Sequence, residues 1–288
     1  MVCEMQIDRD GQLIDAQFFN GVMNSAARLT YEEVDAIQNH RDPSLRREHE
    51  GILKHLEHLY EVFGALRRDR EKRGAIDFNT SESVLEFDDE GQVADIHPAE
   101  RNDAHRLIEE CMVKANVATA RFLQSHRIPA LYRVHGRPAV ERLQNLRQFL
   151  AQTGLTLGGG DEPSPQDYSA LMASIQSRSD RHLIEMIMLR SMMAAEYRPD
   201  NAGHFGLSLD AYAHFTSPIR RYPDLIVHRA IKHVISGQPI ESFTYTTDQL
   251  VSVGEHCSMT DRRAEEAARD AIMTLKCRFM ANRVGHEF

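Results

Sequence analysis

Apolar positions near the start of the chain change from an alternating pattern to a helical one. Cys3, Met5 and Ile7 alternate with polar residues, which predicts strands over residues 2–8 and 12–22 around a turn at residues 9–11. Pro43 then begins a helical stretch that we expect to reach Arg73. Its apolar residues recur at every third or fourth position and lie on one helical face; they are Leu53, Leu56, Leu59, Tyr60, Phe63 and Leu66.

Local signals define the next elements. Thr30 with Glu33 three residues later forms a capping box, which predicts a helix from there to about residue 38. Residues 74–78 and 84–87 are predicted to pair as a second hairpin. Asp88-Asp89-Glu90-Gly91 then turns the chain into a further strand at residues 93–97.

The remainder is mainly helical. Helices are expected at residues 102–126, 137–154, 166–177, 180–197, 223–236 and 247–282, with a strand at 130–135. Residues 158–165 are a glycine- and proline-rich loop, which lacks the G-K-S/T of a phosphate-binding loop. This order predicts an α+β fold of mixed, helix-rich type, in which antiparallel hairpins pack on long helices.

Composition narrows the class of protein without deciding the function. The chain is 42% hydrophobic and 27% charged, with a net charge of −9. This charge argues against nucleic-acid binding over the whole surface but permits a local basic channel. The four cysteines form no C-x-x-C pair, and we expect Cys111 and Cys277 to be reduced core residues. Without a membrane-spanning run or a signal peptide, a cytoplasmic location is expected.

Two segments were considered as metal sites. His55 and His58 lie three residues apart on a helix, unlike the H-E-x-x-H spacing of zinc proteases, and a solvated surface pair is favoured. Asp88-Asp89-Glu90 offers oxygen ligands suited to magnesium. Its position in a predicted tight turn favours the plainer interpretation of turn residues.

The run from His214 to Asp224 has the chemistry of a phosphate-binding element. Two prolines stiffen the chain around Arg220 and Arg221, and Arg220 offers the forked donors that suit a phosphate. Thr216 and Ser217 can donate hydrogen bonds as well. The alternative is that both arginines pair with buried acids, and composition leaves the two interpretations evenly balanced.

The same run resembles the signature of the RNase II/RNase R family of 3′→5′ exoribonucleases. Other segments match this family in the same order, with RNase R the nearer branch; they are Asn102 to Met112, Leu131 to His135, Arg190 to Met192, His204 to Leu207, Cys257 to Met259 and Arg262 to Ala264. The resemblance covers essentially the whole chain. It implies a partial RNase II-type catalytic (RNB) domain over residues 1–283, with residues 284–288 beginning a C-terminal oligonucleotide-binding barrel.

The resemblance implies processive hydrolysis of RNA from a single-stranded 3′ end, with release of nucleoside 5′-monophosphates and aspartate-bound Mg²⁺ in the complete protein. Arg220 would be catalytic, stabilising charge on the phosphate. The other implied residues contact RNA; they are Tyr31, Phe78, Glu110, His214, Thr216, Ser217, Arg221, Tyr222 and Glu266. Glu109 and Glu265 remain the neighbouring alternatives to the two glutamates. RNA and the RNA-decay machinery are the expected partners.

One departure from the family pattern changes what is expected of the chain. The family's magnesium-binding aspartates lie in a short motif that should precede Val2, and no ligand for the metal is expected within these residues. We therefore expect a fragment that holds RNA but hydrolyses it poorly by itself. The competing interpretation is a catalytically inactive RNA-binding relative or scaffold. A helical structural protein unrelated to RNA would not explain the ordered series of matching segments.

Overall fold

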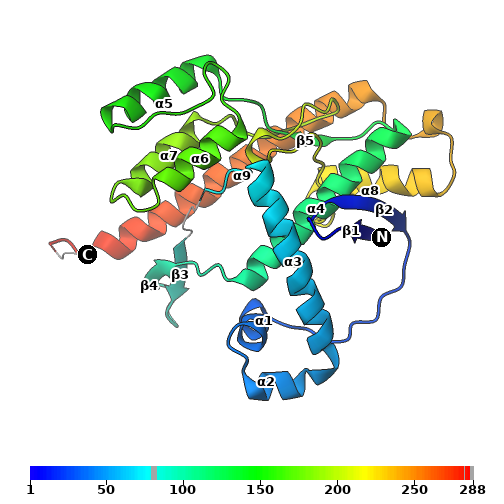
Figure 1. Ribbon diagram of the computed structural model, residues 1–288, viewed down its shortest axis with the longest axis horizontal. Helices are drawn as coiled ribbons and strands as arrows, with labels where there is room; N and C mark the ends of the chain where they lie inside the picture. The colour runs from blue at the N-terminus through cyan, green and yellow to red at the C-terminus, as the bar shows by residue number, and fades with distance from the viewer. Residues whose placement is uncertain (79–82, 282, 286–288) are drawn as a thin grey trace.

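The computed structural model describes residues 1–78, 83–281 and 283–285. Long helices dominate it, and small antiparallel hairpins pack beside them, as the hydrophobic pattern predicts (Figure 1). The α+β, helix-rich fold class is thus confirmed. The expected start of the C-terminal oligonucleotide-binding barrel at residues 284–288 falls mostly outside the described residues. Among the helices of the described part, none is long and apolar enough to cross a membrane.

The first hairpin forms as predicted and packs on helices. Strand β1 (Val2–Ile7) pairs with β2 (Leu13–Phe19). The ring of Phe18 lies 4.7 Å from that of Phe122 on α4 (Asp103–His126) and 5.7 Å from that of Phe215. Helices formed later in the chain, α4 among them, thus cover the apolar face of the hairpin.

The first helices follow their local signals, with one interruption. Thr30 and Glu33 form the predicted capping box of α1 (Tyr31–Gln38). The single helix predicted for residues 43–73 is instead α2 (Pro43–Glu48), the 3-10 turn η1 (Glu50–Ile52) and α3 (Leu53–Arg73). Gly51 lies at the break. Because glycine has a low helix propensity, interrupting the helix at this position sacrifices little stability.

The second hairpin has a different first strand from the one predicted. Strand β3 (Ser83–Phe87) pairs with β4 (Val93–Pro98) across the expected turn, where the Asp88 carboxylate accepts hydrogen bonds from the Glu90 and Gln92 amides. Residues 74–78 form no strand. The Ile76 amide donates instead to the Gly206 carbonyl at 2.9 Å, so this segment is held against the turn at Phe205–Leu207 rather than paired with residues 84–87.

The middle of the chain forms a helical subassembly joined by a short sheet. Helices α5 (Val140–Gln152), α6 (Pro165–Ser174) and α7 (Arg181–Ser191) bury an apolar cluster that includes Tyr168, Ile184 and Met188. The helix predicted to reach residue 197 ends at Ser191. Residues 196–198 form strand β6 (Glu196–Arg198) because they pair with β5 (Tyr132–Val134), a long-range contact without a local signal.

Two further helices complete the fold. Helix α8 (Tyr222–Ile235) buries Ile226, Val227 and Ile231, and the short turns η2 (Phe205–Leu207) and η3 (Ile240–Ser242) flank it in sequence. Helix α9 (Thr247–Ala281) crosses the molecule, with the β3–β4 hairpin beside its second half (Figure 1). Cys277 is exposed there, so its prediction as a core residue is wrong, because this half of α9 extends beyond the buried core.

Candidate RNA-binding site

A groove along α3 and α4 brings together residues from four distant segments. It consists of two hollows of about 540 and 590 Å³ that share Arg70, Asp77 and Arg101. Phe78 and Tyr31 line one hollow, which we call the aromatic hollow, and Glu110 lines the other. Three of the residues predicted to contact RNA therefore lie in one continuous groove.

Stacked rings form one wall of the aromatic hollow. The rings of Tyr31 and His105 stack with centroids 3.9 Å apart. Asn102 holds both, because its amide nitrogen donates to the Tyr31 carbonyl at 3.4 Å and its side-chain oxygen lies 2.7 Å from His105 Nδ1. Tyr31 remains 41% exposed. A flat ring that is both fixed and exposed is suited to stacking on a nucleobase.

The charges of the groove are paired with one another. Arg70 donates to Glu110 at 2.7 Å and lies 3.4 Å from Asp77. Arg101 lies 3.9 Å from Asp77 and also bonds Glu109. The buried Glu110 is thus neutralised by an arginine, whereas Glu109 lines the aromatic hollow. Both adjacent glutamates are therefore paired with an arginine, and which of the two contacts RNA stays a prediction.

A row of enclosed aromatic residues connects this groove to the predicted phosphate-binding run. Tyr212 lines the aromatic hollow, and its ring lies 5.5 Å from that of His214 and 5.3 Å from that of His204. His135 stacks on His204 at 5.0 Å. We call His135, His204 and His214 the histidine cluster. In the sequence, His214 was predicted to contact RNA, whereas His135 and His204 were noted only as part of segments that resemble the family.

The hydrogen bonds of the histidine cluster favour neutral rings. Backbone amides donate to Nδ1 of His135 at 3.0 Å and to Nδ1 of His204 at 3.2 Å, while Nδ1 of His214 lies 2.8 Å from the Tyr197 hydroxyl. Burial, aided by the nearby His135 and Arg133, lowers the pKa of His204 to about 3. Burial also lowers the pKa of His214 to about 2, aided by Arg221. These rings act as hydrogen-bonding and packing groups near neutral pH.

A buried carboxylate fixes the loop that carries the two arginines. Asp224 is completely buried, and its Oδ1 accepts from the Ser217 amide at 2.8 Å and from Arg221 Nη2 at 2.7 Å. The Ser217 carbonyl in turn accepts from the amides of Arg220 and Arg221. We call residues 217–221 the arginine loop. It is closed at both ends by one carboxylate, which predicts a rigid backbone.

The two arginines of this loop differ in their surroundings. Arg221 is an ion-pair partner of the buried Asp224, so the structural alternative holds for it. Arg220 is exposed, and its guanidinium has no hydrogen-bond or ion-pair partner in the described part of the chain. Only Arg220 is therefore available to an external anion without first leaving a carboxylate.

The other predicted RNA contacts are placed as follows. Thr216 and Ser217 are half-buried at the start of the arginine loop, and Tyr222 is 46% exposed just after it. Glu266 is exposed on α9 and is not among the residues that line either hollow. Its contact with RNA stays a prediction.

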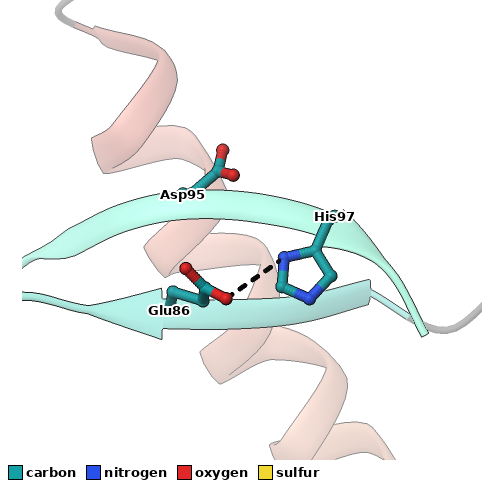
Figure 2. A group of neighbouring side chains, drawn as sticks. All are labelled: Glu86, Asp95 and His97. Carbon is teal, nitrogen blue, oxygen red and sulfur yellow. Dashed lines mark ion pairs between the residues drawn. The ribbon is translucent and has the colours of Figure 1, made fainter. Parts of the chain in front are cut away.

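Within the described residues, one group of three potential metal ligands lies close together. Glu86, Asp95 and His97 project from the β3–β4 hairpin, with their ligand atoms within 4.8 Å of one another (Figure 2). Both carboxylates are exposed, and His97 Nδ1 lies 3.8 Å from Glu86. An open surface group of this kind lacks the enclosure of a catalytic centre, and we assign no metal to it.

Comparison with known proteins defines the class. The model of the RNB domain matches residues 1–237, so the chain belongs to the RNB-domain family. The similar curated proteins are ribonucleases R: the one from Vibrio parahaemolyticus is 47% identical over the full chain, and the one from Escherichia coli K12 is 45% identical. The chain spans 35% and 36% of their respective lengths.

The fold is also that of solved RNase R structures. RNase R from Mycoplasma genitalium, in complex with ribose-methylated single-stranded RNA, superposes with a TM-score of 0.86 at 24% identity. The match covers 99% of this chain and 45% of the other. At this identity the likeness establishes the shared fold. It agrees with the antiparallel hairpins and long helices expected from the sequence.

Proposed function

We propose that this chain is the RNA-holding part of a 3′→5′ exoribonuclease. Membership of the RNB-domain family and the 47% identity to a ribonuclease R support this activity. The observation that carries the proposal is Arg220, which is exposed and unpaired in the described residues, on a loop fixed by the buried Asp224. A preorganised cation of this kind stabilises charge on a phosphate without reorganising first.

The groove and the arginine loop would contact different parts of the RNA: the groove its bases and the loop its phosphates. Phe78 and Tyr31 present rings to successive bases, and stacking of about 1–3 kcal/mol per base accepts any sequence. Arg220 binds the phosphate near the 3′ end, with Thr216 and Ser217 as further donors. The ion pair with Arg70 neutralises the Glu110 carboxylate, so that this carboxylate does not repel the phosphates of the RNA.

Magnesium dependence and release of nucleoside 5′-monophosphates belong to the proposal for the complete protein. The paired carboxylates of the groove do not suit a Mg²⁺ site, because Glu110 and Asp77 lie against Arg70 and Glu109 lies against Arg101. Mg²⁺ binds anionic oxygens that are free of such partners. We therefore assign no residue of the described part to the metal.

Binding and hydrolysis by the 288-residue chain test the two parts of this proposal. We expect the chain to bind a fluorescein-labelled single-stranded RNA in an anisotropy titration, and Arg220→Ala to weaken that binding. Arg47→Ala, at an exposed position on α2, is the matched control. Release of nucleotides should be absent or slow with Mg²⁺ present. Rapid Mg²⁺-dependent release from the 3′ end would contradict the division of roles.

The complete protein tests the role of Arg220 in the reaction. If its guanidinium stabilises charge that develops on the phosphate, Arg220→Ala should lower kcat by about 10²–10³-fold. KM for RNA should change much less, because the groove supplies most of the contacts. An unchanged kcat would remove the catalytic assignment.

A further inference from the structure

The exposed side of α8 continues from the arginine loop and carries no acidic side chain of that helix. Tyr222, Arg229 and Lys232 project from this side, one to two helical turns apart, and follow Arg220 in the sequence. Together with Tyr245 they form what we call the α8 face. Asp224 is the only acidic residue of α8 and is buried under Arg221.

A row of rings supports this face. His233 lies 5.3 Å from Phe243, and Phe243 lies 5.7 Å from Tyr245, between ring centroids. The hydroxyls of Tyr245 and Tyr222 lie 3.1 Å apart. The segment after η3 is thereby held against α8, and the Tyr222 ring stays 46% exposed in a fixed position.

Among the described residues, the cations of the face have no acidic partner. Arg229 donates to the Tyr245 hydroxyl at 2.6 Å, and in the described part of the chain it forms no ion pair. The Lys232 ammonium forms neither an ion pair nor a hydrogen bond with the described residues. The exposed acids nearest in sequence, Glu241 and Asp248, form no ion pair with either cation. This differs from the groove, where the arginines face carboxylates.

We propose that the α8 face is a second contact surface for single-stranded RNA, which extends the path beyond Arg220. Arg229 and Lys232 neutralise phosphates, and Tyr222 supports a base. Charge complementarity favours this occupant: on a chain of net charge −9, a face of unpaired cations beside fixed rings matches a polyanion that carries aromatic bases. The inference rests on the proposed RNA-binding function.

Salt dependence of RNA binding tests the cations. Affinity of the 288-residue chain for a labelled single-stranded 20-mer is measured by anisotropy over a series of KCl concentrations. Because each phosphate contact contributes about 0.7 to the slope of log K against log salt, Arg229→Gln with Lys232→Gln should reduce that slope by about 1.4. Arg47→Gln with Lys54→Gln, an exposed pair on α2 and α3, should leave it unchanged.

Single variants separate contact with RNA from damage to the fold. Lys232→Gln has no internal bond to lose and should reduce the slope by about 0.7. Tyr222→Leu should weaken binding at least about fivefold through lost stacking. If Arg220→Gln weakens binding while the slope of the double variant stays at the wild-type value, the inference is overturned and the proposed function stands. If the wild-type chain does not bind RNA, the proposed function itself fails.

Discussion

The histidine cluster predicts a loss of stability between pH 7 and pH 5. The folded-state pKa values of His204 and His214, about 3 and about 2, lie below the ordinary value of 6.5. The unfolded chain therefore binds protons that the native state excludes. Stability is complete above pH 6.5 and falls as the pH is lowered below that value. The groups that face these rings, Arg133 and Arg221 among them, are cationic or neutral and oppose protonation further.

The size of the effect follows from the two pKa values. For each proton that the native state excludes, one pH unit below 6.5 lowers the free energy of unfolding by about 1.36 kcal/mol. At pH 5 each ring therefore removes about 2 kcal/mol of stability. The two rings together remove up to about 4 kcal/mol. This is a large share of the roughly 5–15 kcal/mol that stabilises a typical domain. His135, whose pKa is also lowered mainly by burial, acts in the same direction.

Urea unfolding followed by circular dichroism at several pH values from 5 to 8 measures this loss. In His214→Asn the amide replaces Nδ1 as partner of the Tyr197 hydroxyl without a titrating group, so the decline between pH 7 and 5 should shrink by about 2 kcal/mol. His58→Asn, at an exposed position, should keep the wild-type decline. A wild-type stability that is flat across this range, or a His214→Asn variant with the full decline, would refute the reasoning.

Two further substitutions test the packing around the site. Asp224→Ala leaves the Arg221 guanidinium without its buried partner, and urea unfolding should show a loss of about 3–5 kcal/mol; a loss below 1 kcal/mol would mean that the loop is held by other contacts. Gly254→Ala places a methyl group against the carbonyl oxygen of Tyr197, where α9 meets β6, and should cost about 1–3 kcal/mol. Gly64→Ala, in the more open middle of α3, is its control and should be neutral or stabilising. Equal melting temperatures for these two glycine variants would contradict the close contact.

Elements with local sequence signals were predicted correctly, and the errors in predicting strands arose where long-range contacts determine the structure. The capping box of Thr30 and the periodicity of α3 act within a few residues, so the sequence contains all that determines them. The β6 strand was missed because only β5, more than 60 residues away, makes it a strand. Residues 74–78 look like a strand locally but find their partner in Gly206.

Local sequence patterns were equally insufficient to identify the residues that line the groove. Tyr31 and Phe78 were singled out through a family resemblance, since nothing in their local sequence separates them from core aromatic residues. His105 and Tyr212 were not predicted, although His105 stacks on Tyr31 and the Tyr212 ring lies against that of His214. The positions of His105 and Tyr212 depend on how α4 packs against the segment that precedes the arginine loop. Local sequence patterns do not determine that packing.

The neighbouring arginines could not be assigned different roles from composition, and the geometry of the structure distinguishes them. Arg220 and Arg221 are identical in chemistry and adjacent in sequence, so a phosphate contact and a structural ion pair were equally good predictions for both. Burial of Asp224 separates them, because a completely buried carboxylate requires a charged or hydrogen-bonding partner and the helix start places Arg221 three residues before it. Once Arg221 meets that requirement, Arg220 on the same turn projects outward. The ion pair thus belongs to Arg221, and Arg220 is left exposed for the phosphate contact that we propose.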